Sequence, residues 1–101
     1  MKKANVIWTP RSQADLREIQ TYIARNAPDR AMAFIERIRD RVERLRPTPQ
    51  IGAVVPELGD PNVREVLLGN YRIVYREFDD LLYILTVFHS ARLLRSDEIT
   101  E

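Results

Sequence analysis

Three β-type runs separated by two-residue connectors constrain the fold of this chain more than any other feature. The runs are VREVLL at 63–68, YRIVYREF at 71–78 and LLYILTVFH at 81–89. Gly69-Asn70 puts glycine first, as a type II′ hairpin turn requires, and Asp79-Asp80 forms the second connector. Such short connectors join antiparallel neighbours, because parallel strands need a long crossover. The C-terminal half is therefore predicted to be an antiparallel meander.

The N-terminal half contains a short apolar run followed by two helical patterns. Residues 4–8, ANVIW, are β-prone and predict a first strand. Thr9 is a favourable N-cap with Pro10 at the first helical position, and apolar residues then recur at spacings of three and four. This helix ends before Pro28, since the residue preceding a proline avoids the helical region. A second helix begins near Pro28 and is stopped by Pro47.

These elements predict an α+β fold with the order β-α-α-β-β-β. The helical hairpin is expected to pack on one face of a mostly antiparallel four-stranded sheet and to leave the other face open. Residues 47–62 hold four of the six prolines and predict a long loop, and residues 92–101 form a polar tail. A length of 101 residues with 45% hydrophobic residues fits one domain over 1–101.

Several classes of protein and site are excluded by composition. The chain has no cysteine, so it forms neither disulfides nor thiolate metal sites. No stretch approaches the roughly 18 apolar residues of a membrane span, and the opening lacks the apolar segment of a signal peptide, so a cytoplasmic protein is expected. There is also no metal-ligand cluster, glycine-rich phosphate loop or nucleophile motif. Neither a metal nor a cofactor is therefore expected.

The positive charge of the chain is carried almost entirely by arginine. The net charge is only +1, but arginines number 14 against two lysines. A planar guanidinium pairs bidentately with carboxylate or phosphate, so this bias suits recognition of either, although a GC-rich genome produces the same bias. The outer face of the second helix is either a partner surface or simply solvated. Its charged residues are Glu36, Arg37, Arg39, Asp40, Arg41, Glu43, Arg44 and Arg46.

Alternation along the strands assigns side chains to the two faces of the predicted sheet. In 71–78, the apolar set should face the helices, which leaves Arg72 and Arg76 on the open face. The apolar set is Tyr71, Ile73 and Tyr75. In 63–68, alternation puts Arg64 on the side opposite Val63, but only the register decides which of these sides is exposed.

The single histidine, His89, ends the last predicted strand, and Arg92 follows three residues later. We expect Arg72, Arg76, His89 and Arg92 to converge at one edge of the open face. A histidine near arginines suggests phosphate chemistry, because imidazole can move a proton while arginines hold a phosphate and stabilise charge in the transition state. The alternative is a structural histidine at a strand end.

The order of elements and several motifs together resemble the RelE/ParE superfamily of bacterial toxins. The resemblance covers nearly the whole chain and rests on VIWTPRSQADLREIQTYIA, RAMAFIERIRDRVERL, GNYRIVYRE and ILTVFHSAR. It implies the toxin of a type II toxin–antitoxin system, which inhibits growth and is neutralised by a cognate antitoxin. RelE-like members cut mRNA on the ribosome without a metal, whereas ParE-like members poison DNA gyrase by binding it.

Comparison of single positions with this superfamily favours the ParE-like branch. Arg72 and Arg92 match arginines of the nucleases, but the run at 63–68 lacks their lysine pair and no tyrosine follows Arg92. The stretch VFHSAR is similar to the ending of ParE-like chains. The resemblance therefore implies a gyrase poison that acts by binding rather than as an enzyme. The alternative is a metal-independent mRNA endonuclease that uses Arg72, His89 and Arg92.

The resemblance also implies partners for the chain. These are the cognate antitoxin and DNA gyrase, or the ribosome and mRNA under the alternative, with no membrane partner. A homodimer or a hetero-oligomer with the antitoxin fits the superfamily. Because the predicted sheet has an unpaired edge, the antitoxin is expected to add a strand there. The candidate residues for contact with the target or with nucleic acid are Arg64, Arg72, Arg76, Arg92 and Arg95.

Overall fold

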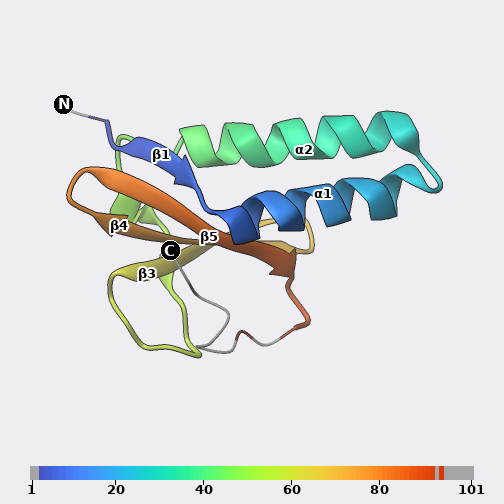
Figure 1. Cartoon of the computed structure of the whole chain (residues 1–101). Coiled ribbons are helices and arrows are strands. Elements are labelled where there is room, and N and C mark those ends of the chain that lie inside the picture. Colours follow the sequence, from blue (N-terminus) through green and yellow to red (C-terminus); the bar gives the residue numbers. More distant parts are fainter. Residues whose placement is uncertain (1–2, 93, 95–101) are drawn as a thin grey trace.

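The computed structural model describes residues 3–92 and 94, and its helices and strands form two layers (Figure 1). Both helices lie on one side of the sheet, as predicted. The N-terminal elements are β1 (Asn5–Trp8), α1 (Pro10–Ala24) and α2 (Pro28–Glu43). After a 3₁₀ turn at Pro49–Ile51, the chain forms β2 (Ala53–Val54), β3 (Val63–Leu68), β4 (Tyr71–Phe78) and β5 (Leu81–His89).

The sheet has five strands in the order β1-β5-β4-β3-β2, so the predicted number of four was wrong. β1 runs parallel to β5, and the remaining pairs are antiparallel. The additional strand, β2, lies within the segment 47–62 that was predicted to be a loop. It pairs Ala53 with Glu65 and Val54 with Arg64. Two residues are too few to produce an alternating pattern, which explains why the sequence did not reveal this strand.

Both hairpin turns of the meander use left-handed backbone. Gly69 has a φ of 57°, which agrees with the predicted type II′ turn. Asp79 and Asp80 have φ values of 52° and 64°, and positive values at both central positions are the requirement of a type I′ turn. Aspartate tolerates this region better than most residues because its short polar side chain bonds locally to the backbone.

β5 carries one extra residue, Leu85, opposite β4, and this bulge is fastened to the start of α1. The hydroxyl of Thr9 lies 2.7 Å from the carbonyl oxygen of Ile84 and 3.1 Å from that of Leu85. The Thr9 hydroxyl oxygen also accepts a hydrogen bond of 3.1 Å from the backbone N–H of Ser12. The predicted N-cap residue therefore holds α1 against the irregular part of the sheet.

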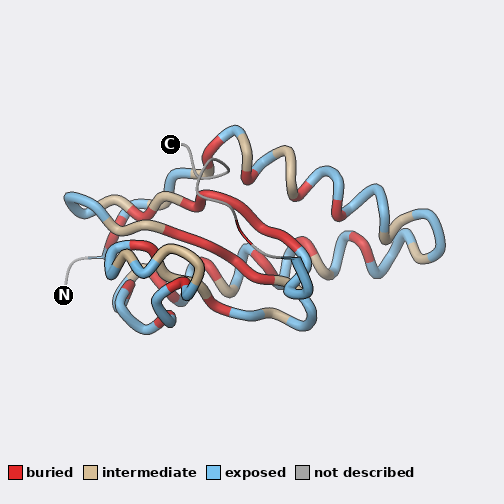
Figure 2. The backbone as a smooth tube through the Cα atoms, turned by 90° about the horizontal axis from the view of Figure 1, so that it is seen from below, coloured by how far each residue is buried: buried red, intermediate tan, exposed pale blue. Residues whose placement is uncertain are grey.

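Apolar side chains pack on both faces of the sheet, so the prediction of an open second face was wrong. Buried segments run along the central strands and along one side of each helix (Figure 2). The cluster between helices and sheet includes Leu16, Ile19, Ile35, Ile38, Val42, Leu45, Ile73, Tyr75, Leu82, Ile84 and Val87. The cluster on the second face consists of Val55, Val63, Val74, Leu85, Phe88 and Leu94. The second face is thus covered by the segment after β2 and by Leu94.

These clusters also show which face of the sheet each residue of β3 occupies. Val66 and Leu68 pack in the helix-side cluster, whereas Val63 belongs to the second cluster. Since side chains alternate along a strand, Arg64 lies on the helix side of β3, and Glu65 and Leu67 lie on the second face.

Tyr75 anchors the segment that precedes β2. Its side chain is fully buried, and its hydroxyl donates a hydrogen bond of 2.6 Å to the carbonyl of Pro49. The same oxygen accepts a bond of 2.9 Å from the N–H of Gly52. A Cβ atom at Gly52 would lie 2.2 Å from that oxygen and 2.7 Å from the carbonyl oxygen of Glu65, so only glycine fits. A single hydroxyl therefore positions the entry into β2.

Replacing this hydroxyl tests the anchor. We expect Tyr75→Phe to lower the free energy of unfolding by about 1–3 kcal/mol, because two buried backbone groups lose their partner. Tyr83→Phe removes the same atom from a half-buried tyrosine on β5 whose hydroxyl forms no hydrogen bond with the described residues, and it should be nearly neutral. Urea denaturation of both variants measures the difference, and equal stabilities would contradict the anchor.

Candidate functional site

Arg72 is buried at the centre of a charge network on the second face, not exposed there as predicted. The exposed fraction of its side chain is 7%. Its Nη1 and Nη2 donate to the two carboxylate oxygens of Glu57 at 2.6 and 2.8 Å, and its Nε donates to Glu65 at 2.5 Å. The guanidinium carbon lies 4.9 Å from the centre of the Phe88 ring. We name the group Arg72, Glu57, Glu65 and Phe88 the Arg72 clamp.

The clamp changes the protonation behaviour of its members. The hydrogen bonds from Arg72 lower the pKa of Glu57 from its ordinary value of 4.5 to about 2. The same bonds raise the pKa of Arg72, which therefore stays positively charged. Because each nitrogen of the guanidinium already donates to a carboxylate, Arg72 has little capacity left for a further anion in this arrangement.

The clamp also holds the C-terminal segment. The N–H of Leu94 donates to Glu57 at 2.9 Å, and Leu94 is buried. The carbonyl of Arg92 accepts a bond of 3.3 Å from Arg72, and the Arg92 guanidinium lies 5.2 Å from the Phe88 ring centre. Two of the predicted site residues, Arg72 and Arg92, are therefore brought together. Arg95, another candidate, lies outside the described residues.

His89 does not join this group, so the predicted convergence of Arg72, Arg76, His89 and Arg92 is wrong. In the β4–β5 register, Tyr71 pairs with His89 and Arg72 pairs with Phe88. The His89 ring lies edge-on to Tyr71 with 5.6 Å between ring centres, on the helix side. Its Nδ1 accepts a bond of 3.2 Å from the N–H of Ala91. The exposed imidazole and the buried guanidinium are thus on opposite faces of the sheet.

The remaining candidate arginines are divided between the two faces. Arg76 shares the face of Arg72, where its Nη2 lies 3.7 Å from a carboxylate oxygen of Asp60. Arg64 lies on the helix side, and its Nη1 donates a bond of 3.0 Å to the carbonyl of Gly52. No single surface therefore collects all of the arginines that were singled out in the sequence.

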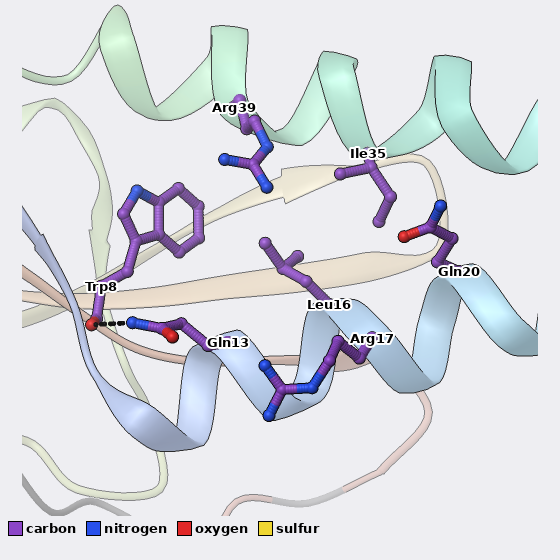
Figure 3. Close-up of a pocket in the computed structure, with 7 residues that line it drawn as sticks. All are labelled: Trp8, Gln13, Leu16, Arg17, Gln20, Ile35 and Arg39. Atoms are coloured by element: carbon purple, nitrogen blue, oxygen red, sulfur yellow. Dashed lines mark hydrogen bonds between the residues drawn. The ribbon is translucent and has the colours of Figure 1, made fainter.

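A pocket of about 310 Å³ between α1 and α2 was not predicted (Figure 3). Leu16 and Ile35 point into it from the two helices, and the Arg39 guanidinium lies 6.0 Å from the centre of the Trp8 ring. The lining residues are Trp8, Gln13, Leu16, Arg17, Gln20, Ile35 and Arg39. Trp8, which precedes the N-cap of α1, was the one residue in the sequence that indicated this pocket. The periodicity of the two helices instead assigned Leu16 and Ile35 to the core.

Two negative findings apply to the part of the chain that the structure describes. No group of three histidine, cysteine, aspartate or glutamate side chains is placed to hold a metal ion. No helix among these residues has the length and apolar character needed to cross a bilayer.

Neutralising one member tests the Arg72 clamp. Because its folded-state pKa is depressed, ionised Glu57 stabilises the fold above about pH 4.5, and this contribution is lost as the pH falls towards 2. We expect Glu57→Gln to lower the free energy of unfolding by about 1–3 kcal/mol at neutral pH, with a smaller difference from wild type near pH 3. The control is Glu36→Gln, at an exposed position of α2, and urea denaturation at both pH values is the measurement. Equal stability of the two variants at neutral pH would contradict the clamp.

Comparison with known proteins identifies the family. The family model described as ParE toxin of type II toxin-antitoxin system, parDE, matches residues 6–94. The chain is also 34% identical over 91 residues to Toxin RelE2 of Caulobacter vibrioides. The aligned region covers 89% of this chain and 99% of that relative.

Two solved structures share the fold. One is from the chromosomal ParDE system of P. aeruginosa, with a TM-score of 0.74, 23% identity, and coverage of 86% of this chain and 96% of that chain. The other is from the toxin–antitoxin complex RelBE2 of Mycobacterium tuberculosis, with a TM-score of 0.57, 22% identity, and coverage of 86% and 98%. Since the family model spans nearly all of the described residues, the chain belongs to the ParE toxin family of type II toxin–antitoxin systems.

Proposed function

We propose that this toxin inhibits growth by binding and poisoning DNA gyrase, and that a cognate antitoxin neutralises it. Family membership supports the toxin role. The choice of gyrase as the target rests on one observation, that Arg72 and His89 lie on opposite faces of the sheet. Metal-independent RNA cleavage requires a proton-transfer group and a cation that reach the same phosphate. The separation and the occupied donors of Arg72 favour action by binding.

A second candidate function is ribosome-dependent mRNA cleavage of the RelE type. Arg72 and Arg92 both approach the Phe88 ring, which places two cations near each other. The relative from Caulobacter vibrioides also bears the name RelE2. Under this function, His89 would have to act together with these arginines as the proton-transfer group.

His89→Ala separates the two functions. A general acid or base contributes about 10²–10⁴-fold to a rate, so a nuclease would lose most of its toxicity. A gyrase poison that uses its surface should remain as toxic as wild type, and purified protein should inhibit supercoiling and accumulate cleaved DNA. Growth after induction and a gyrase assay on the same preparation are the measurements.

Sequencing of mRNA ends after induction completes this test. Codon-phased cuts that disappear in His89→Ala, with no effect on purified gyrase, would contradict the proposal and establish the second function. Asn70→Ala, at the exposed turn between β3 and β4, is a matched control near the histidine and should behave as wild type in both assays.

The pocket between the helices is the place we propose for the antitoxin. It has an apolar floor and two arginines on its rim, so it fits an apolar side chain of the antitoxin flanked by an acidic one. Strand addition is less favoured, because β2 has only two residues and the outer edge of β1 is partly occupied. Arg46 bonds both backbone groups of Ala4, and Gln13 donates to the carbonyl of Trp8.

Charge reversal at the rim tests this placement. We expect Arg39→Glu to weaken antitoxin binding by about tenfold or more and to slow association, because Arg39 is exposed and attracts the acidic partner. Arg25→Glu makes the same change of charge at an exposed position outside the pocket and should bind as wild type. Surface plasmon resonance with the product of the neighbouring gene measures both, and equal affinities would contradict the placement.

A further inference from the structure

A second hollow lies on the other side of α2 and is rich in arginine. It has a volume of about 280 Å³ and is lined by Arg37, Asp40, Arg41, Arg44 and Leu68. The three arginines follow each other at spacings of four and three, so they share one face of the helix. At about 1.5 Å per residue they extend about 10 Å along its axis. We name this surface, between α2 and the end of β3, the α2 groove.

The arginines of the α2 groove form no ion pair with a carboxylate of the described residues. Within residues 3–92 and 94, no carboxylate forms an ion pair with Arg37, Arg41 or Arg44, although Asp40 lines the same hollow. By contrast, Arg46 bonds Glu43 at 2.9 Å, and each guanidinium nitrogen of Arg72 donates to a carboxylate. The groove therefore combines a concave shape with a surplus of positive charge.

Arg64 on β3 lies opposite Tyr75 in the β3–β4 register, on the helix side of the sheet. Burial raises the pKa of the Tyr75 hydroxyl, while the charges of Arg64 and Arg41 act in the opposite direction. Both guanidinium groups therefore act on the same buried hydroxyl from the helix side of the sheet. Arg64, a contact candidate from the sequence, does not line the α2 groove itself.

The chemistry of the groove fits phosphate better than a protein surface. Cores of protein interfaces are apolar and depleted of charge, whereas Leu68 is the only apolar residue among those that line the hollow. A row of planar guanidinium groups with free donors is suited to phosphate oxygens. We infer that the α2 groove binds the backbone phosphates of duplex nucleic acid. This binding is independent of gyrase and goes beyond the proposed function.

The test measures binding of the purified chain to a labelled 24-base-pair DNA duplex of arbitrary sequence by fluorescence anisotropy. Three phosphate contacts predict a slope of about −2.7 for log K against log salt concentration. Arg41→Gln combined with Arg44→Gln should weaken binding by about tenfold at low salt and make the slope shallower by about 2, equally for unrelated sequences. An RNA duplex of the same sequence identifies which backbone is preferred.

The matched control removes the same charge at the far end of the helical hairpin, as Arg25→Gln combined with Arg30→Gln, two exposed positions outside the pocket and the groove. It should retain most of the DNA affinity and nearly the whole salt slope. The inference is overturned if wild type fails to bind the duplex at low salt, or if both double variants lose affinity equally. It is also overturned if the groove variant keeps its DNA affinity but loses antitoxin affinity, which would assign the groove to an acidic protein segment.

Discussion

The ion pairs of Arg72 are the interaction on which the second face of the sheet depends. Removing a guanidinium from water costs several kcal/mol, and this cost is offset only when opposite charges meet it with good geometry. Here one carboxylate comes from the adjacent strand and the other, Glu57, from the segment after β2. Because Glu57 also bonds the N–H of Leu94, one buried charge fastens two separate segments over the apolar second cluster.

The same interaction changes the meaning of Arg72 for function. An arginine on a strand of a toxin suggests a phosphate ligand. Here the carboxylates of Glu57 and Glu65 accept the hydrogen bonds that a phosphate would accept from Arg72. The strand pairing then separates it from the histidine, since neighbouring positions on β4 face opposite sides. The arrangement therefore gives Arg72 a structural role on the second face.

Much of the fold follows from periodicity, and the failures have local causes. The helical hairpin, the meander and the direction of Tyr71, Ile73 and Tyr75 depend on patterns that are long and regular. The two faces of β5 cannot be assigned from such a pattern, because the bulge at Leu85 interrupts the alternation of side chains. Leu82, Ile84 and Val87 therefore all lie on the helix side. The Arg72 clamp could not be predicted either, since Glu57 lies in a segment without periodicity and meets Arg72 only through tertiary packing. Of the apolar residues in 47–62, Val55 and Leu58 pack in the second cluster, whereas Ile51 and Val54 are exposed.

The arginines of the described chain differ in their partners, which explains how a net charge of only +1 coexists with a hollow lined by three arginines. The carboxylates of Glu57 and Glu65 form ion pairs with the buried guanidinium of Arg72 on the second face. The guanidinium groups of Arg37, Arg41 and Arg44 are left without such partners on α2. The pocket between the helices and the α2 groove lie on opposite sides of α2, and a helix is only about 10 Å wide. Ligands bound at these two surfaces would therefore lie close to each other. An acidic antitoxin seated in the pocket would therefore lower the positive potential that a phosphate backbone meets in the groove.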